Sequence, residues 1–316
     1  LIINNDISMT TELKRLLKTE PFSIHGRNEK VYSFSKESES FDFYTDQFSG
    51  ENAFKIGSGI KTEDINDSPK EMIELISFLQ KNMDTESIIL ELGGSKHQRR
   101  SGFPYAFFSN YFPLDISISS MIGYSELYDR ESVACNAQNI PLVDSSVDVV
   151  YTHTFLEHPI NPDKVVKEID RILKDGGLVI HSDAWHCRWW KRFGVYRVKK
   201  WNEMTLNEKG LCLIIFVNEL NLVRFPIIII KRLIKELFIS KKQPQDLIYK
   251  KLTPNYDLKI YSDEDAASSI DPIDLIRFYE QRKYKLIKKR SFLQRIFFNE
   301  PNIYLKKGVN TVYNKA

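Results

Sequence analysis

Residues 87–94 read Ser-Ile-Ile-Leu-Glu-Leu-Gly-Gly, a short apolar run that ends on two glycines. Such a run is typical of a buried parallel strand, because both faces of the strand pack against helices. Gly93 and Gly94 have no Cβ, so the backbone can pass close to a ligand at this point. The stretch therefore predicts a strand whose carboxyl end opens into a binding loop.

Similar apolar runs recur along the chain and alternate with amphipathic stretches. Strands are predicted at 87–92, 111–114, 132–135, 147–152 and 178–181, with two late strands at 284–291 and 302–307. Helices are predicted at 68–79, 162–173 and 271–280, each beginning at a capping residue followed by proline. Alternation at this spacing favours βαβ units. We predict an α/β fold with a Rossmann-like, doubly wound, mostly parallel sheet of seven strands.

This pattern divides the chain into four segments. Residues 67–183 form the predicted core, and residues 259–316 supply the end of its sheet and a C-terminal tail. Residues 1–66 lack a sustained period and are predicted to be an irregular N-terminal extension. Residues 184–258 are aromatic, basic and then apolar, which predicts a large inserted lid after the fifth strand. Its aromatic and basic residues suit either stacking on a ligand beside phosphates, or packing on the core with the cations in solvent.

Charge is distributed unevenly along the chain. Although the net charge is only +3, residues 186–316 hold 27 Lys and Arg against 13 Asp and Glu. One interpretation is that two solvent-exposed faces simply differ in charge. The other is that the C-terminal half contacts an anionic partner such as a phosphate-bearing substrate, lipid head groups or nucleic acid. Residues 222–242 could form a basic amphipathic helix on a membrane, although a core-packed or dimer-forming helix is the commoner outcome.

The three cysteines are widely spaced and predict neither a disulfide framework nor a metal site. They fit a reducing compartment. The apolar stretch 211–230 is interrupted by charged residues and by Pro226, which argues against a spanning helix. We therefore expect a cytoplasmic protein, with peripheral contact to a membrane as the alternative.

Polar residues follow several of the predicted strands. In an open parallel sheet, ligands bind at the carboxyl ends of the strands. Asp115 follows the second strand, where its carboxylate can accept hydrogen bonds from two ribose hydroxyls. Asn136 and Ala137 follow the third strand, and Thr152 and His153 end the fourth. These positions predict one binding site along a single edge of the sheet.

Together these motifs resemble the class I methyltransferases that use S-adenosylmethionine (SAM), and most closely the type 11 group, which includes many small-molecule and glycan enzymes. The similarity covers residues 68–183 and, more weakly, 260–308. The motifs that carry it are Glu91-Leu92-Gly93-Gly94, Asp115-Ile116-Ser117, Asn136-Ala137-Gln138-Asn139-Ile140-Pro141, Ser146-Val147-Asp148-Val149-Val150, Phe155-Leu156-Glu157-His158 and Leu173-Lys174-Asp175-Gly176-Gly177.

The resemblance implies which residues bind the cofactor. Glu91, Gly93 and Gly94 would wrap the methionine end of SAM, Asp115 would hold the ribose, and Ile116 would pack on the adenine. Asn136 would face the adenine amine and accept a hydrogen bond from it. The remaining predicted cofactor-binding residues are Ala137 and Thr152, and no metal is predicted.

The first loop departs from the pattern of the family. Gly-x-Gly-x-Gly is usual there, whereas Ser95 and His97 occupy the second and third glycine positions. Lys96, Arg99 or Arg100 could compensate by pairing with the SAM carboxylate. Solvated basic residues on a loop are an equally good interpretation.

Methyl transfer from a sulfonium is an in-line displacement, in which positioning matters most and an oxygen nucleophile gains from a base near neutral pKa. Histidine suits this role. The candidates are His153, His158 and His181, with Asp183 as a partner, whereas His186 is better interpreted as a lid residue.

We therefore predict a SAM-dependent methyltransferase that acts on a hydroxyl of a small-molecule or glycan acceptor, which could be anionic or lipid-linked. One alternative is a non-catalytic binding protein that kept the fold and lost the cofactor, as Ser95 and His97 would suggest. Another is an RNA methyltransferase, but the sequence has no recognised RNA-binding module, so a nucleic-acid partner is disfavoured. An NAD enzyme is disfavoured because a Gly-x-Gly-x-x-Gly loop is absent. The oligomeric state is left open.

Overall fold

A computed structural model describes residues 12–26, 28–34, 70–94, 108–190, 192, 200–238, 245–256, 264–287, 291, 293, 296–297 and 302–308. The chain divides into two compact units. Unit 1 comprises residues 1–152 and 167–179, and unit 2 comprises residues 153–166 and 180–316. Helix α6 (Pro162–Ile172) and strand β7 (Leu173–Ser182) each contribute residues to both units.

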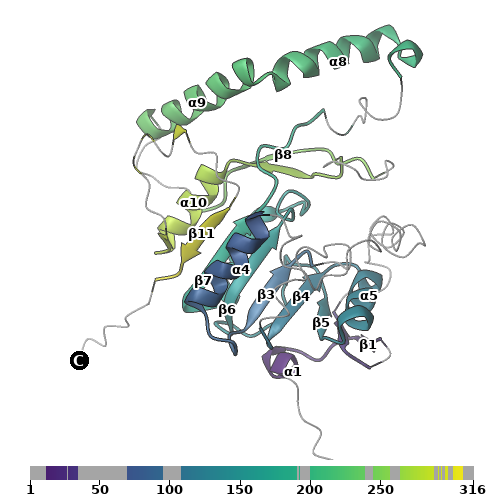
Figure 1. Cartoon of the computed structure of the whole chain (residues 1–316), viewed down its shortest axis with the longest axis vertical. Helices are drawn as coiled ribbons and strands as arrows, with labels where there is room; N and C mark the ends of the chain where they lie inside the picture. The colour runs from purple at the N-terminus through teal and green to yellow at the C-terminus, as the bar shows by residue number, and fades with distance from the viewer. Residues whose placement is uncertain are drawn as a thin grey trace, which may run out of the picture. The chain divides into compact units, whose positions relative to one another are not determined.

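Parallel strands form the centre of unit 1. They are β3 (Ile89–Leu92), β4 (Tyr111–Asp115), β5 (Ser132–Ala134), β6 (Val147–His153) and the first part of β7. Strand β3 pairs in parallel with β4 and with β6, so that Leu92 lies opposite both Leu114 and Thr152. The carboxyl ends of β3, β4 and β6 therefore meet at one edge (Figure 1). The strands predicted at these positions are confirmed.

The N-terminal residues extend this sheet. After α1 (Glu12–Leu16), β1 (Ser23–His25) pairs antiparallel with β2 (Val31–Ser33), and β2 pairs in parallel with β5. Val31 and Tyr32 are buried. Residues 23–25 and 31–33 are thus part of the sheet rather than irregular, whereas the domain boundaries stay predictions.

Two further helices of unit 1 are α4 (Lys70–Asn82) and α5 (Ile118–Tyr128). In α4, Leu75, Ile76 and Leu79 are buried, as their helical spacing predicts. The expected cap of α4 at Ser68 lies outside the described residues. Helix α5 packs against β2, β4 and β5.

Unit 2 contains the rest of β7 together with short strands and helices. The strands are β8 (Tyr249–Lys251), β9 (Ser268–Ile270), β10 (Lys285–Leu286) and β11 (Ile303–Lys306), and both β8–β9 and β10–β11 are antiparallel pairs. The helices are η5 (Trp201–Glu203), α8 (Leu206–Glu219), α9 (Asn221–Phe238) and α10 (Pro272–Gln281). Asp271 caps α10 by accepting from the N–H of Ile273 at 3.0 Å, which confirms the start that was predicted.

The strand order of the described sheet is β1-β2-β5-β4-β3-β6-β7-β11-β10. It has nine strands, so the prediction of seven was wrong, because β1 and β2 were not anticipated. The sheet is mixed, since the β1–β2 and β10–β11 pairs are antiparallel. An α/β architecture with a parallel centre is what the sequence predicted. That residues 184–258 act as a lid remains a prediction.

Candidate functional site

The turn after β3 brings two backbone segments of unit 1 close together. Gly93 has φ +77°, in the left-handed region that favours glycine. A Cβ on Gly94 would lie 2.6 Å from Pro113 Cβ and 3.1 Å from Glu91 Oε2. The N–H groups of Gly93 and Gly94 donate to the Leu114 carbonyl at 2.8 and 3.2 Å. Position 94 therefore requires glycine, and the turn fixes the end of β3 against the end of β4.

Glu91 is a buried carboxylate in β3. Its Oε2 accepts a short hydrogen bond from the hydroxyl of Tyr111 in β4. Burial, followed by the charge of Glu91, raises the pKa of Tyr111 well above its ordinary value, so the hydroxyl stays protonated as a donor. Glu91 thus joins β3 to β4, and its contact with the methionine end of SAM stays a prediction.

Asp115 ends β4 at the same edge and is half-buried. Its Oδ1 accepts from the N–H of Ser117 at 2.8 Å, and Ser117 Oγ in turn accepts from the N–H of Ser120 at 3.2 Å as the cap of α5. These bonds hold the carboxylate near the helix N-terminus, where the helix dipole favours negative charge. Since a carboxylate has about four acceptor positions, Asp115 can accept from further donors. Ile116, next in the chain, is half-buried.

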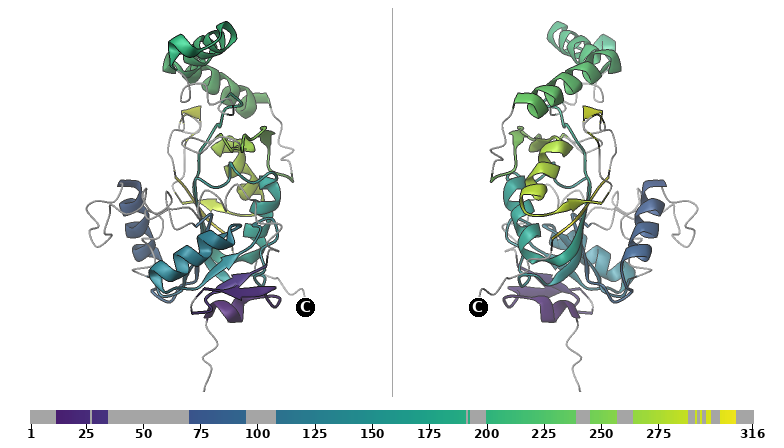
Figure 2. Two further views of the ribbon diagram at one scale, coloured as in Figure 1. Left: turned by 90° about the vertical axis from the view of Figure 1, so that its right-hand side faces the viewer. Right: turned by 90° about the vertical axis from the view of Figure 1, so that its left-hand side faces the viewer.

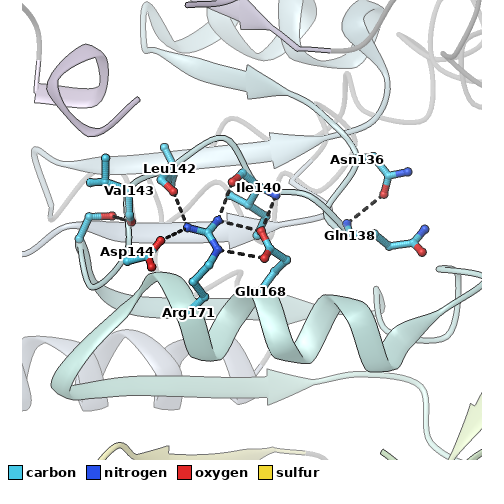
Figure 3. Close-up of polar contacts among 9 residues, drawn as sticks. Asn136, Gln138, Ile140, Leu142, Val143, Asp144, Glu168 and Arg171 are labelled. Atoms are coloured by element: carbon cyan, nitrogen blue, oxygen red, sulfur yellow. Dashed lines mark hydrogen bonds and ion pairs between the residues drawn. The ribbon is translucent and has the colours of Figure 1, made fainter. Parts of the chain in front are cut away.

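The loop after β5 holds Asn136 in an exposed position and Ala137 in a buried one. Asn136 Oδ1 accepts from the N–H of Gln138 at 2.9 Å, and the amide nitrogen points away from this contact (Figure 3). An amide held in this way offers a donor to a ligand. The amide oxygen keeps a second lone pair, so the hydrogen bond expected from the adenine amine stays a prediction, and the amide nitrogen could in addition donate to a ring nitrogen of the base.

Arg171 on α6 anchors the continuation of this loop within unit 1 (Figure 3). Its guanidinium donates to both carboxylate oxygens of Glu168, at 2.9 and 2.8 Å. It also donates to the carbonyls of Ile140 and Leu142, at 2.7 and 2.8 Å, and to Asp144 at 2.6 Å. Glu168 accepts from the N–H of Ile140 at 2.8 Å. Because bidentate Arg–carboxylate pairs are geometrically specific, this network fixes the path of the chain after Asn136.

Thr152 and His153 end β6 in succession. Thr152 is fully buried and lies opposite Leu92 of β3. His153 is half-buried, and its Nδ1 lies 3.2 Å from Oγ of Ser182. Successive strand residues point to opposite faces, so only one of the two can face a ligand on a given side. The register in unit 1 favours Thr152 as the residue associated with the turn at Gly93.

In unit 2, His158 lies between two buried carboxylates. Its side chain is 25% exposed, its Nδ1 lies 2.8 Å from Asp265 Oδ2, and its Nε2 lies 3.7 Å from Glu157 Oε1. The side chains of Glu157 and Asp265 are 1% and 0% exposed. A buried carboxylate beside an imidazole orients the ring and stabilises its protonated form. Because Nε2 lies beyond hydrogen-bond distance of Glu157 and the side chain is partly exposed, His158 is a candidate to accept a proton at Nε2.

The turn that carries His158 is fastened to β9. The carbonyl of Glu157 accepts from the N–H groups of Ala267 and Ser268 at 2.8 and 2.9 Å. Ser268 Oγ donates to the carbonyl of Leu156 at 3.0 Å. These bonds limit the freedom of the turn, and hence of the His158 backbone.

Asp183 holds the same turn from the end of β7. Its Oδ1 accepts from the N–H groups of Phe155 and Leu156 at 3.0 and 3.2 Å, and its Oδ2 lies 3.3 Å from Nδ1 of His181. His181 is fully buried, and its Nε2 lies 3.1 Å from the hydroxyl of Tyr279. His181 is fully buried, whereas His158 is partly exposed, so the contacts of His181 suit orienting Asp183, and its assignment as a catalytic residue stays a prediction.

Two residues of this arrangement, Asp265 and Tyr279, were not predicted from the sequence. Asp265 is separated from His158 by the whole of residues 184–258, so no local spacing connects them. One signal was present: the acidic run 263–265 stands directly before two alanines, Ala266 and Ala267, and a charge buried beside apolar residues needs a partner.

His186, interpreted as a lid residue, has φ +59° and lies 3.3 Å from Arg232. Burial is the main cause that lowers its pKa to about 4, opposed by Asp271 and assisted by Arg232, Arg188 and Arg224. The histidine of the unfolded chain titrates near pH 6.5. The contribution of neutral, buried His186 to the free energy of unfolding is therefore fully present above pH 6.5. It is lost as the pH falls from about 6.5 to about 4, by up to about 3 kcal/mol.

We expect His186→Asn to remove most of this pH dependence, because asparagine tolerates positive φ and does not titrate. Urea unfolding at pH 7 and at pH 4.5 measures it. If the free energy of unfolding of the variant fell between pH 7 and pH 4.5 as much as that of the wild type, groups other than His186 would cause the loss.

Several predicted residues lie outside the described part of the chain, namely Ser95, Lys96, His97, Arg99 and Arg100. Among the described residues, no group of three or more His, Cys, Asp or Glu is arranged to hold a metal ion.

Comparison with known proteins identifies the domain around this site. Residues 90–181 match the family model described as a methyltransferase domain. The matched range is a class I SAM-dependent methyltransferase domain, which confirms the resemblance, and SAM is the methyl donor of this class.

Two curated relatives match parts of the chain. A sterol 4-C-methyltransferase of Caenorhabditis elegans, strm-1, is 47% identical over 51 residues, which are 16% of this chain and 15% of the relative. A malonyl-[acyl-carrier protein] O-methyltransferase of Marinomonas sp. (strain MWYL1) is 30% identical over 73 residues, 22% of this chain and 27% of the relative. The chain thus spans little more than a quarter of these relatives at most.

Solved structures give partial likenesses. The sugar N-methyltransferase KedS8 of Streptoalloteichus sp. is 12% identical, with a TM-score of 0.33 over 40% of this chain and 51% of that chain. The geranyl diphosphate C-methyltransferase of Streptomyces coelicolor is 14% identical, with a TM-score of 0.30 over 34% of this chain and 44% of that chain.

The residues of unit 1 fit a nucleoside cofactor such as SAM. At Gly94 a Cβ would collide with Pro113, so glycine there lets the turn after β3 pack against β4 at the edge where Asp115 ends its strand. Asp115 supplies acceptors for ribose hydroxyls, and the Asn136 amide supplies a donor for a base. The partly buried Ile116 supplies apolar surface of the kind that an adenine ring packs on.

Proposed function

We propose that the chain transfers the methyl group of SAM to a hydroxyl of a small-molecule or glycan acceptor. The observation that carries the proposal is the pair of polar groups at the end of β4 and after β5, beside the turn after β3 in which only glycine fits at position 94. When bound, SAM supplies an electrophilic methyl group on a sulfonium sulfur. Glu91, Gly93, Gly94, Asp115, Ile116, Asn136, Ala137 and Thr152 would hold it.

His158 serves as the general base in this proposal. It would take the proton of the acceptor hydroxyl, to which SAM, when bound, would supply the methyl group. Asp265 orients the imidazole and balances its charge in the protonated state. Asp183, backed by His181 and Tyr279, positions the turn. His153 is the second candidate for the base, because it is half-buried.

The names of the two curated relatives are compatible with a small acceptor. One is named for a sterol and the other for a carrier-bound malonyl group, and one methylates carbon whereas the other methylates oxygen. We infer the hydroxyl acceptor from the presence of a base with a carboxylate partner, which an oxygen nucleophile needs more than a softer one does.

Titration calorimetry with SAM tests the cofactor part of the proposal. We expect saturable binding and a rise in melting temperature, since a ligand that binds only the folded state stabilises it. Absence of heat and of any thermal shift at millimolar SAM would reject the proposal. Binding of SAM without transfer of radiolabelled methyl to any hydroxyl in a panel of small molecules and glycans would favour a non-catalytic binding protein.

A further inference from the structure

Helices α8 and α9 of unit 2, together with Leu220 between them, carry many exposed apolar side chains. We call this set the arm face: Leu206, Leu213, Ile214, Phe216, Val217, Leu220, Leu222, Phe225, Ile227, Ile230 and Ile234. Leu206 and Leu222 are 89% and 88% exposed. Scattered apolar side chains are normal on a protein surface, but a set of this size on two consecutive helices marks a place of interaction.

The arm face is a regular feature of α8. Leu206, Leu213 and Val217 follow helical spacing on one side and are exposed, whereas Cys212 and Ile215 are buried. The helix begins in a capping box, in which the Thr205 hydroxyl accepts from the N–H of Glu208 and Glu208 accepts from the Thr205 N–H. The exposed apolar residues of α8 therefore form the solvent-facing side of a well-formed helix.

Arg232 fixes α9 to the rest of unit 2. It is 4% exposed and donates to the carbonyl of Ile296 at 3.2 Å. It also lies 3.3 Å from Nε2 of His186 and 3.5 Å from Oδ1 of Asp271. Phe225 lies at the margin of the arm face, with its ring tilted against that of Phe297 and the ring centroids 6.5 Å apart. These contacts decide which side of α9 is covered, and the apolar side chains of the arm face lie on the remainder.

Length and bend distinguish resting on a bilayer from crossing it. Among the described residues no single helix is long and apolar enough to cross a membrane, and residues 206–218 and 222–234 pass that test only as a pair bent by 61° (Figure 2). Arg224 and the exposed Lys231 also interrupt the apolar sequence. A bent pair of amphipathic helices suits the interface plane, where apolar side chains enter the acyl boundary and charges stay at the head groups.

Charge and aromatic residues around the arm fit an anionic lipid surface. Residues 186–242 hold 13 Lys and Arg against four Asp and Glu. Trp201, just before α8, is 54% exposed, and Lys209 Nζ lies 5.8 Å from its ring centroid. Tryptophan and lysine together are typical of the level of lipid head groups. A second copy of the chain would instead bring the same basic residues together.

We propose that the arm face docks in the plane of a lipid bilayer that contains anionic head groups. The apolar side chains of α8 and α9 enter the boundary of the acyl chains, and Lys209 and Lys231 meet the lipid phosphates. The proposal concerns binding alone and does not depend on SAM or on any methyl transfer.

Sedimentation of the full chain with lipid vesicles tests it. We expect the protein to co-sediment with anionic vesicles of phosphatidylcholine mixed with phosphatidylglycerol, and to a smaller extent with neutral vesicles of phosphatidylcholine alone. Phe216→Glu should lower the bound fraction at least about tenfold, because it places a charge among the acyl chains. The matched control is Phe22→Glu, an equally drastic change at a 68% exposed position of unit 1, which should bind like the wild type. Lys231→Glu should weaken binding to the anionic vesicles only.

Several results would overturn the proposal. The first is a wild-type chain that stays in solution with both the anionic and the neutral vesicles. The second is equal binding to vesicles by Phe216→Glu and Phe22→Glu. Retention on vesicles after alkaline carbonate extraction would indicate insertion across the bilayer. A dimer in light scattering that Phe216→Glu dissociates, without vesicle binding, would assign the arm face to a second copy.

Discussion

Replacement of His158 by alanine should lower kcat by about 10²- to 10⁴-fold and leave the affinity for SAM unchanged. The proton of the acceptor hydroxyl would have no base, because the imidazole whose Nδ1 lies 2.8 Å from Asp265 would be missing. The predicted cofactor residues belong to unit 1 and remain intact. Rates of methyl transfer from radiolabelled SAM, with the acceptor found in the panel, give kcat, and calorimetry gives the affinity.

Asp265→Asn separates orientation from basicity. We expect a smaller fall in kcat and a shift of the acid limb of the pH–rate profile to lower pH, because an amide stabilises the imidazolium less than a carboxylate does. A merely structural role of Asp265 would leave that limb in place. The matched control for His158→Ala is His25→Ala, which replaces a histidine of β1 in unit 1 and should leave kcat unchanged. Wild-type turnover by the His158 variant would mean that the base lies elsewhere, with His153 the next residue to test.

Local patterns explain why much of the parallel sheet was predictable. Strands β3, β4 and β6 are apolar runs, and α10 has a capping aspartate followed by proline. Strands β1 and β2 have three residues each and mix polar with apolar side chains, so no period could reveal them. Strand β7 begins at Leu173, five residues before the apolar run from 178. Its first residues belong to the strand because of their pairing with a neighbouring strand and not because of their hydrophobicity. There Lys174 pairs with Asp148 of β6 at 2.9 Å.

The candidate site was predictable where it follows strands and not where it depends on distant partners. Gly94 and Asp115 come directly after or at the end of apolar runs, so their position at the sheet edge follows from the topology. The partner of His158 is Asp265, more than 100 residues later in the chain. Arg171 on α6 donates to the carbonyls of Ile140 and Leu142, which lie before β6. Such pairings depend on the three-dimensional course of the chain, which spacing along one sequence does not encode.

Asp115→Asn is expected to weaken SAM binding by about 10- to 100-fold. A hydrogen bond to a charged group contributes about 1.5–3 kcal/mol, and an amide that keeps one acceptor for Ser117 cannot also accept from both ribose hydroxyls. The asparagine oxygen can still accept from the N–H of Ser117, which Asp115 Oδ1 does at 2.8 Å. The start of α5, and with it the melting temperature without ligand, should therefore change little.

Asp115→Ala should weaken SAM binding further, because it also removes the acceptor that holds the Ser117 N–H at the start of α5. The difference between the two variants separates ligand contact from support of the turn. Asp129→Asn at the other end of α5 is the matched control, since Asp129 is exposed and its side chain contacts Asn28 and Lys30. If Asp115→Asn bound SAM as tightly as Asp129→Asn does, the ribose would be held by another residue. The placement of the cofactor along the carboxyl ends of β3, β4 and β5 would then have to be abandoned.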